Sequence, residues 1–106
     1  MKKNLENIFN YEGYLLNYKN WNKEIAINIA TKESIKITKK HWEIIFFIRK
    51  FYLKYKITPS IRMLIKTINK KKKINIDSQY LFILFPKGPA KQASKIAGIP
   101  KSNNCL

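Results

Sequence analysis

Residues 39–55 constrain the fold most, because they form a long run without glycine or proline in which apolar side chains recur at helical spacing. Thr38 precedes the run and is a favourable N-cap, so the pattern predicts a helix from Lys39 to Tyr55. Apolar side chains cover one stripe and much of the remaining surface, which predicts a central helix with other elements packed on several sides. His41 falls in the first turn, near the positive end of the helix, and is expected to be structural.

Four shorter segments carry helix start and stop signals. Their expected positions, in chain order, are 23–32 capped by Asn20 or Asn22, a helix that starts at Pro59 with Thr58 as its cap, 79–85 capped by Asp77, and 90–97 started by Pro89 and stopped by Gly98. Residues 1–18 lack a helical period and place β-prone runs around an Asn/Gly turn, which predicts a small β-hairpin. The expected fold is therefore mainly α, a compact helical bundle with a small N-terminal β-hairpin and a mobile C-terminal arm.

The length of 106 residues predicts a single domain, since a chain of this size buries one modest core. We expect residues 1–18 to form the hairpin region, 20–97 the helical body and 98–106 a flexible arm. No apolar run approaches the roughly 20 residues that span a bilayer, and the start does not resemble a signal peptide. The expected location is the cytoplasm, without membrane association.

Composition restricts the chemistry. The chain has one cysteine, which excludes an internal disulfide framework and a multi-cysteine metal site, so no metal and no cofactor are expected. The net charge of +16 favours acidic partners such as RNA. An A/T-biased genome would also enrich Lys, Ile and Asn, and would make the chain basic without any functional reason.

The cysteine, Cys105, is the penultimate residue. It follows a short polar stretch that lies beyond the helix-stopping pair Gly98 and Pro100. From Pro100 to Leu106 the extended chain would reach roughly 23–25 Å. A lone thiol on such a tether is suited to entering the active site of a neighbouring protein.

Several sequence segments, in order and at matching spacing, resemble the TusE/DsrC family along essentially the whole chain. The matching segments are Glu12-Gly13-Tyr14-Leu15, Trp21, His41-Trp42-Glu43, Arg49, Phe51-Tyr52, Pro59-Ser60-Ile61-Arg62-Met63-Leu64, Tyr80-Leu81 and Leu84-Phe85-Pro86-Lys87-Gly88-Pro89-Ala90-Lys91. The resemblance implies a mainly helical body with an N-terminal β-hairpin and a mobile C-terminal arm, and it maps the reactive family cysteine onto Cys105.

In the DsrC branch a second cysteine stands eleven positions before the first, where this chain has Ser94. A hydroxyl cannot form a disulfide, so this departure favours the TusE branch, the sulfur carriers of tRNA 2-thiouridine synthesis. The resemblance then implies a sulfurtransferase that carries a persulfide on Cys105. Its implied partners are the TusBCD complex as sulfur donor and the thiouridylase MnmA with bound tRNA as acceptor. Ser102 also stands where many relatives have a second proline.

Four cations are candidates for supporting the thiol. Lys101 would favour the thiolate by its charge. Arg62, Lys87 and Lys91 would steer the arm or stabilise a persulfide anion through charge-assisted contacts. The alternative for each is a solvated cation, or one bonded to a carbonyl group.

Two other functions remain open at this stage. The helices separated by residues 57–59, together with the positive charge, are compatible with a small nucleic-acid-binding module of the helix-turn-helix kind. Beyond Arg62, however, the second helix lacks an obvious set of base-reading side chains. A DsrC-like adaptor of sulfite reduction is the other alternative, and Ser94 counts against it.

Overall fold

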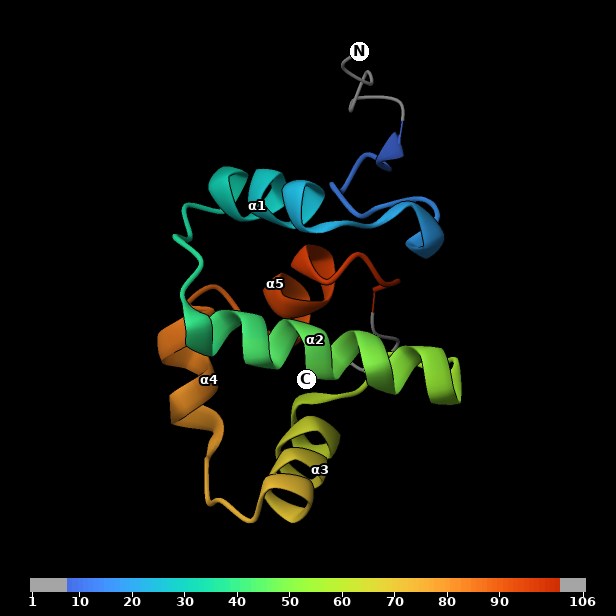
Figure 1. The fold of residues 1–106 in the computed structure, drawn as a ribbon. Helices are drawn as coiled ribbons and strands as arrows, with labels where there is room; N and C mark the ends of the chain where they lie inside the picture. The colour runs from blue at the N-terminus through green and yellow to red at the C-terminus, as the bar shows by residue number, and fades with distance from the viewer. Residues whose placement is uncertain (1–7, 102–106) are drawn as a thin grey trace.

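The computed structural model describes residues 8–101, which form one short 3₁₀-helix and five α-helices (Figure 1). The elements are η2 (Tyr18–Asn20), α1 (Lys23–Lys32), α2 (Lys39–Tyr55), α3 (Ile61–Lys72), α4 (Ser78–Leu84) and α5 (Pro89–Ile96). The mainly α prediction is confirmed. None of the helices within 8–101 combines the length and apolarity needed to cross a bilayer.

Short polar side chains fix most helix starts by accepting a hydrogen bond from an otherwise unpaired amide of the first turn. Asn22 caps α1 through the amide of Ile25 at 2.8 Å, and Asp77 caps α4 in the same way. α3 differs from the prediction, because Ser60 is its cap and Pro59 stays outside the helix.

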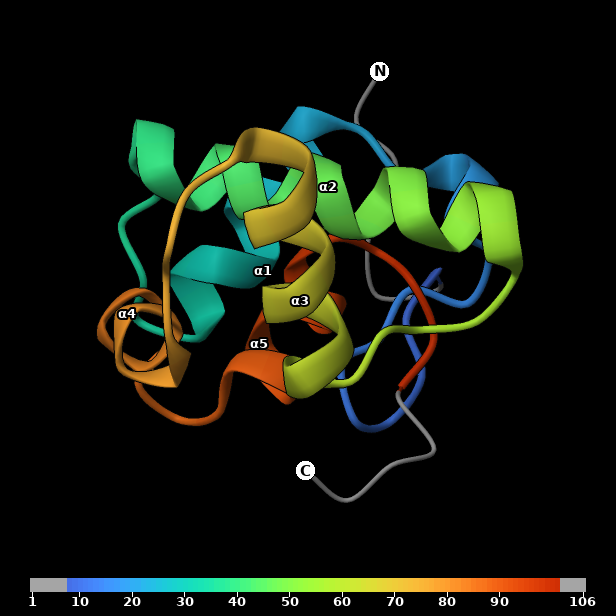
Figure 2. The ribbon, with the colours of Figure 1, turned by 90° about the horizontal axis from the view of Figure 1, so that it is seen from below.

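The element that the others surround is α5. It packs against α1, α2 and α4, and in Figures 1 and 2 it lies at the middle of the helical layers. Every residue from 92 to 99 is buried, although Gln92, Ser94 and Lys95 are polar. The last helix therefore provides the centre of the core.

α2 is less central than its sequence suggests. Its buried side chains lie along one face, at His41, Ile44, Ile45 and Ile48. Apolar side chains on the rest of the helix remain 42–52% exposed at Phe46, Leu53 and Tyr55. A helix of this kind covers the core from one side, because it buries a single apolar stripe and leaves its other faces exposed.

The predicted N-terminal β-hairpin is wrong. Among residues 8–101 the only strand-like pairing is an isolated antiparallel bridge between Phe9 and Leu15. The Asn10 side chain accepts hydrogen bonds from the amides of Glu12 and Tyr14, both at 2.9 Å, which forms a tight turn. Asn17 then caps η2, so the extended run ends before a second strand develops. Residues 1–7 of the predicted hairpin lie outside the described part.

His41 joins the start of α2 to the end of α4. Its Nδ1 accepts a hydrogen bond from the backbone amide of Thr38 at 3.0 Å, and its Nε2 lies 2.8 Å from the carbonyl oxygen of Leu84. An Nδ1 that accepts from an amide carries no proton, so the ring is the neutral tautomer that donates from Nε2. The structural role predicted for His41 agrees with this geometry.

Replacing His41 with phenylalanine should lower the free energy of unfolding by about 2 kcal/mol, because the carbonyl of Leu84 would remain buried without a donor. Urea unfolding followed by circular dichroism measures the change. A variant as stable as the parent protein would show that this hydrogen bond contributes nothing to stability.

Candidate functional site

The site begins where α5 ends and the chain turns toward residues 102–106. The amide of Gly98 donates to the carbonyl of Lys95 at 3.1 Å, and the amide of Ile99 donates to that of Ser94 at 3.2 Å. This pair of bonds is a Schellman motif, which requires a left-handed residue after the helix, and Gly98 has φ +69°. The predicted helix stop is therefore confirmed and has a defined geometry.

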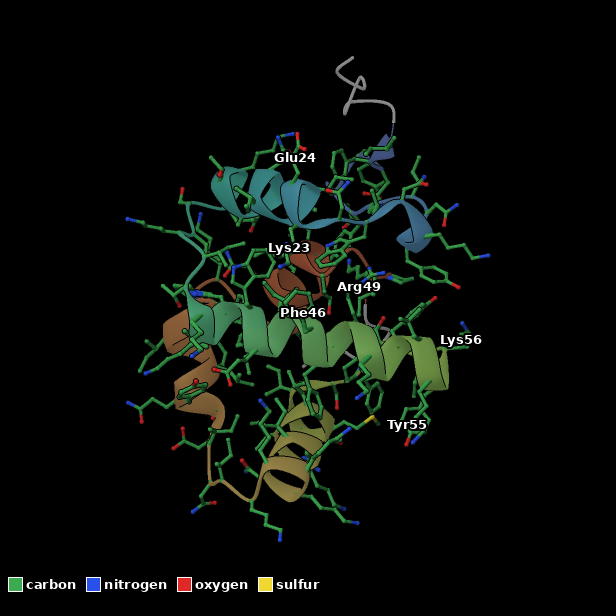
Figure 3. The ribbon with its side chains drawn as sticks, viewed as in Figure 1. Lys23, Glu24, Phe46, Arg49, Tyr55 and Lys56 are labelled. Carbon is green, nitrogen blue, oxygen red and sulfur yellow. The ribbon has the colours of Figure 1, made fainter. Side chains whose placement is uncertain are left out.

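Two side chains from distant segments close the carbonyl end of α5. The indole Nε1 of Trp21 donates to the carbonyl of Ile96 at 2.9 Å, and Nη1 of Arg49 donates to that of Ala97 at 2.8 Å. A cation at this position also complements the negative end of the helix dipole. Figure 3 shows the Arg49 side chain reaching from α2 toward this region.

Arg49 and Trp21 also support each other. The guanidinium carbon lies 4.3 Å from the centre of the Trp21 ring, a cation–π contact, and Nη2 donates to the carbonyl of Tyr18 at 3.2 Å. Burial lowers the pKa of the Arg49 guanidinium, which nevertheless remains charged at neutral pH. A Cβ at Gly98 would lie 2.3 Å from Trp21, so the clamp leaves room only for glycine.

Thr58 holds the chain one step further on. Its hydroxyl donates to the carbonyl of Pro100 at 2.7 Å, across the loop between α2 and α3. The prediction of Thr58 as a helix cap is therefore wrong, because this hydroxyl is used to fix the departing chain. Ile99, the residue before Pro100, is 1% exposed. Lys101, the last described residue, is exposed.

Lys101 stands between two surface clefts. Its Nζ lies 3.2 Å from a carboxylate oxygen of Glu12, an ion pair between the two ends of the described chain. One cleft, of about 310 Å³, is lined by Tyr52, Lys56, Ile57, Thr58, Met63, Pro100 and Lys101. The other, of about 270 Å³, is lined by Phe9, Asn10, Tyr11, Glu12, Gly13, Ile29, Lys32, Glu33 and Lys95.

A partly buried polar network in the wall of the second cleft ties α5 to the end of α1. Glu33 accepts a hydrogen bond from Gln92 at 3.1 Å and pairs with Lys95 at 3.3 Å. Burial alone raises the pKa of the Glu33 carboxyl, but the hydrogen bonds from Gln92 and Lys95 and the charges of Lys95 and Lys87 hold it below its ordinary value. The carboxylate is therefore ionised and paired at neutral pH.

The predicted site residues are placed as follows. Cys105 lies outside the described residues, four positions beyond Lys101, so the covalent chain limits its distance from Lys101 to about 14 Å. Lys101 stands at the exit, while Arg62, Lys87 and Lys91 are exposed. Arg62 begins α3 beside Met63 of the first cleft, whereas the other two belong to the start of α5 and the turn before it.

Sequence reasoning missed the positioning residues. Trp21 and Arg49 were noted only as parts of the family resemblance. Nothing in their local sequence links Trp21 to Ile96, which is 75 positions later, or Arg49 to Ala97, which is 48 positions later. Within the described ranges, no three His, Cys, Asp or Glu side chains gather closely enough to hold a metal ion.

Comparison with known proteins identifies the family of the chain. The family model described as "DsrC like protein" matches residues 2–106. The chain is 59% identical to sulfurtransferase TusE of Buchnera aphidicola from Acyrthosiphon pisum, covering 90% of this chain and 84% of the relative. It is 48% identical to sulfurtransferase TusE of Salmonella typhimurium, covering 90% and 88%.

Solved structures show the same fold. The NMR structure of Allochromatium vinosum DsrC has a TM-score of 0.84 and 41% identity, covering 92% of this chain and 88% of that one. The crystal structure of the oxidized γ-subunit of dissimilatory sulfite reductase (DsrC) from Archaeoglobus fulgidus has a TM-score of 0.80 and 36% identity, covering 92% and 90%. The chain belongs to the DsrC-like family, which confirms the TusE/DsrC resemblance. With its high identity to TusE proteins, it is a sulfurtransferase.

Replacing Arg49 with lysine should lower the free energy of unfolding by about 2 kcal/mol, because one ammonium cannot serve both carbonyls and stack on Trp21. The matched control is Arg62→Lys on the exposed start of α3, which should change stability by less than about 0.5 kcal/mol. Denaturant unfolding compares the two. Equal effects would contradict the role of Arg49 as a clamp.

Glu33 should make the free energy of unfolding depend on pH in the acid range. Its folded pKa lies below the ordinary value of 4.5, so its contribution is complete above pH 4.5 and is lost as the pH falls through the folded pKa. Glu33→Gln should cost about 2 kcal/mol at pH 7, less than a fully buried pair because Glu33 is 21% exposed. The difference should shrink below pH 4.5. Urea unfolding at several pH values tests this, and a constant difference would contradict it.

Proposed function

We propose that Cys105 is a persulfide carrier of tRNA 2-thiolation, which accepts sulfur from a TusBCD complex and passes it to MnmA for the wobble uridine. The observation that carries this proposal is the clamped exit of α5, which delivers the chain to the surface four residues before its one cysteine. The names of the TusE relatives support sulfur transfer. Residues 98–106 would be the arm of a single domain, held at its base by the clamp and carrying the thiol near its outer end.

The proposed transfer conserves electrons. The Cys105 thiolate attacks the outer sulfur of a donor persulfide, the sulfur–sulfur bond of the donor breaks, and the donor leaves as a thiolate. Cys105 then holds the outer sulfur as a persulfide. In the second step a thiolate of the acceptor attacks that outer sulfur, and Cys105 returns to its thiolate form. No external oxidant or reductant is needed for either exchange.

Activation of the thiol would come partly from the partner. A free cysteine has a pKa of about 8.5, so only a minority is thiolate at neutral pH. Lys101 would add positive charge near the arm, although its ammonium is already paired with Glu12. Arg62 would contribute beside the first cleft, whereas Lys87 and Lys91, exposed at the start of α5, would contact an incoming partner.

The position of Ser94 supports a one-thiol mechanism. Ser94 lies within α5 and is 1% exposed, and its carbonyl accepts the hydrogen bond from Ile99 in the Schellman motif. A serine hydroxyl forms no disulfide, so the arm would not close onto this position as a disulfide. Sulfur would therefore leave Cys105 by transfer to a partner.

Cys105→Ser should abolish sulfur acceptance and leave folding intact. The protein is incubated with a cysteine desulfurase, cysteine and the upstream relay proteins, and its intact mass is measured. The parent protein should gain one sulfur, roughly 32 Da, which a reducing agent removes. Ser94→Ala is the matched control and should still accept sulfur. Sulfur acceptance by the Cys105→Ser variant would disprove the proposed role.

A further inference from the structure

One stretch of the chain carries only positive charge. Between Glu43 and Asp77 there are ten Lys and Arg residues and no Asp or Glu. This stretch covers most of α2, the following loop and all of α3. A genome-wide drift in composition would add lysine everywhere, whereas the fold decides whether these lysines gather on one surface.

The fold brings part of this charge together at the carboxyl ends of α2 and α3. Lys71 on α3 lies against Lys50 of α2, with Lys54 and Tyr55 also close by. The charge of Lys50, and then that of Lys54, lowers the pKa of Lys71, as expected for like charges that face one another. The three ion pairs formed by the described residues involve other lysines.

Aromatic rings lie within the same cluster. Tyr55 is 52% exposed, and its ring centre lies 4.8 Å from that of Phe51, one turn earlier. The ammonium of Lys54 lies 5.2 Å from the Tyr55 ring centre. Figure 3 shows Tyr55 at the carboxyl end of α2, where it extends on the side of the helix on which α3 lies. We call Lys50, Phe51, Lys54, Tyr55 and Lys71 the basic–aromatic patch.

We infer that the basic–aromatic patch binds a single-stranded segment of RNA. Lysines that repel one another when the surface is empty are stabilised by a polyanion, and each phosphate neutralised releases counterions. An exposed tyrosine between lysines adds a face on which an unpaired base stacks. An acidic protein surface would satisfy the lysines but would leave the exposed face of Tyr55 without a stacking partner.

The patch lies close to the exit of the chain. Tyr52 and Lys56, which line the cleft beside Lys101, belong to the same last turns of α2 as Lys54 and Tyr55. A single RNA segment on the patch would therefore lie along the same last turns of α2 that line the cleft beside Lys101. Assigning this RNA as the tRNA whose uridine receives the sulfur rests on the proposed function; RNA binding itself does not.

The test measures the affinity of the full-length protein for a labelled single-stranded RNA of about 10 nucleotides by fluorescence anisotropy at several salt concentrations. The triple variant Lys50→Gln, Lys54→Gln, Lys71→Gln should lower the slope of log affinity against log salt by about 2, or 0.7 for each lost phosphate contact. The matched control is Lys36→Gln, Lys39→Gln, Lys40→Gln, which removes the same charge near the start of α2, roughly 20 Å away. The control should retain the parent slope.

Variants of Tyr55 distinguish the contribution of base stacking to RNA binding from that of charge. Tyr55→Ala should weaken binding of the single strand about 5- to 100-fold, and Tyr55→Phe should keep the affinity. Neither variant should weaken binding of duplex RNA, whose bases are already stacked. Circular dichroism confirms that both variants fold, as expected for an exposed position.

Three results would overturn the inference. Equal losses in the patch and control triple variants would show that binding follows net charge alone. Competition by polyglutamate as strong as that by RNA of equal charge would identify an acidic protein as the partner. An unchanged affinity of Tyr55→Ala would exclude base stacking. The patch triple variant should still gain one sulfur on Cys105 in the mass measurement, so failure of RNA binding would leave the sulfur-transfer proposal standing.

Discussion

The closure of the carbonyl end of α5 is the interaction on which the rest of the structure depends. A helix end buried in a core exposes carbonyl groups that cannot reach water, and each must find a donor. Trp21 and Arg49 supply two of these donors from segments far away in the sequence, and the Schellman motif at Gly98 supplies the others. The same contacts fix residues 96–99, so one set of hydrogen bonds both completes the core and positions the base of the candidate arm.

Much of the helical fold was predictable because its signals are local. The start of α1 at Asn22, the start of α4 at Asp77 and the stop at Gly98 all depend on residues within one turn of the helix end. The hairpin prediction failed for the same reason. β-propensity was visible, but the Asn17 side chain caps η2 and so ends the extended run after Leu16, and propensity alone does not reveal this local competition.

The site was only partly predictable. Cys105 stands out because it is the one thiol, whereas the residues that hold the chain after α5 are defined by contacts across the fold. Thr58 shows the difference. As a sequence signal it resembled a helix cap, and in the structure its hydroxyl binds the carbonyl of Pro100, 42 residues later. The central place of α5 was equally hidden, because Gln92 and Lys95 are polar and the partner that they share, Glu33, is 59 and 62 residues away in the sequence.

The burial of residues 92–99 also has a consequence for synthesis. These residues are made after α1, α2 and α4, yet all three of those helices pack around the helix they form. The usual order, in which early segments fold while later ones are still being added, cannot complete this core. Chains that stop short of residue 92 lack its centre, and native contacts such as that between Trp21 and Ile96 join the two ends of the body. Ribosomes that terminate early therefore release chains without this core, and a molecule that reaches the native state has been translated to within a few codons of its thiol.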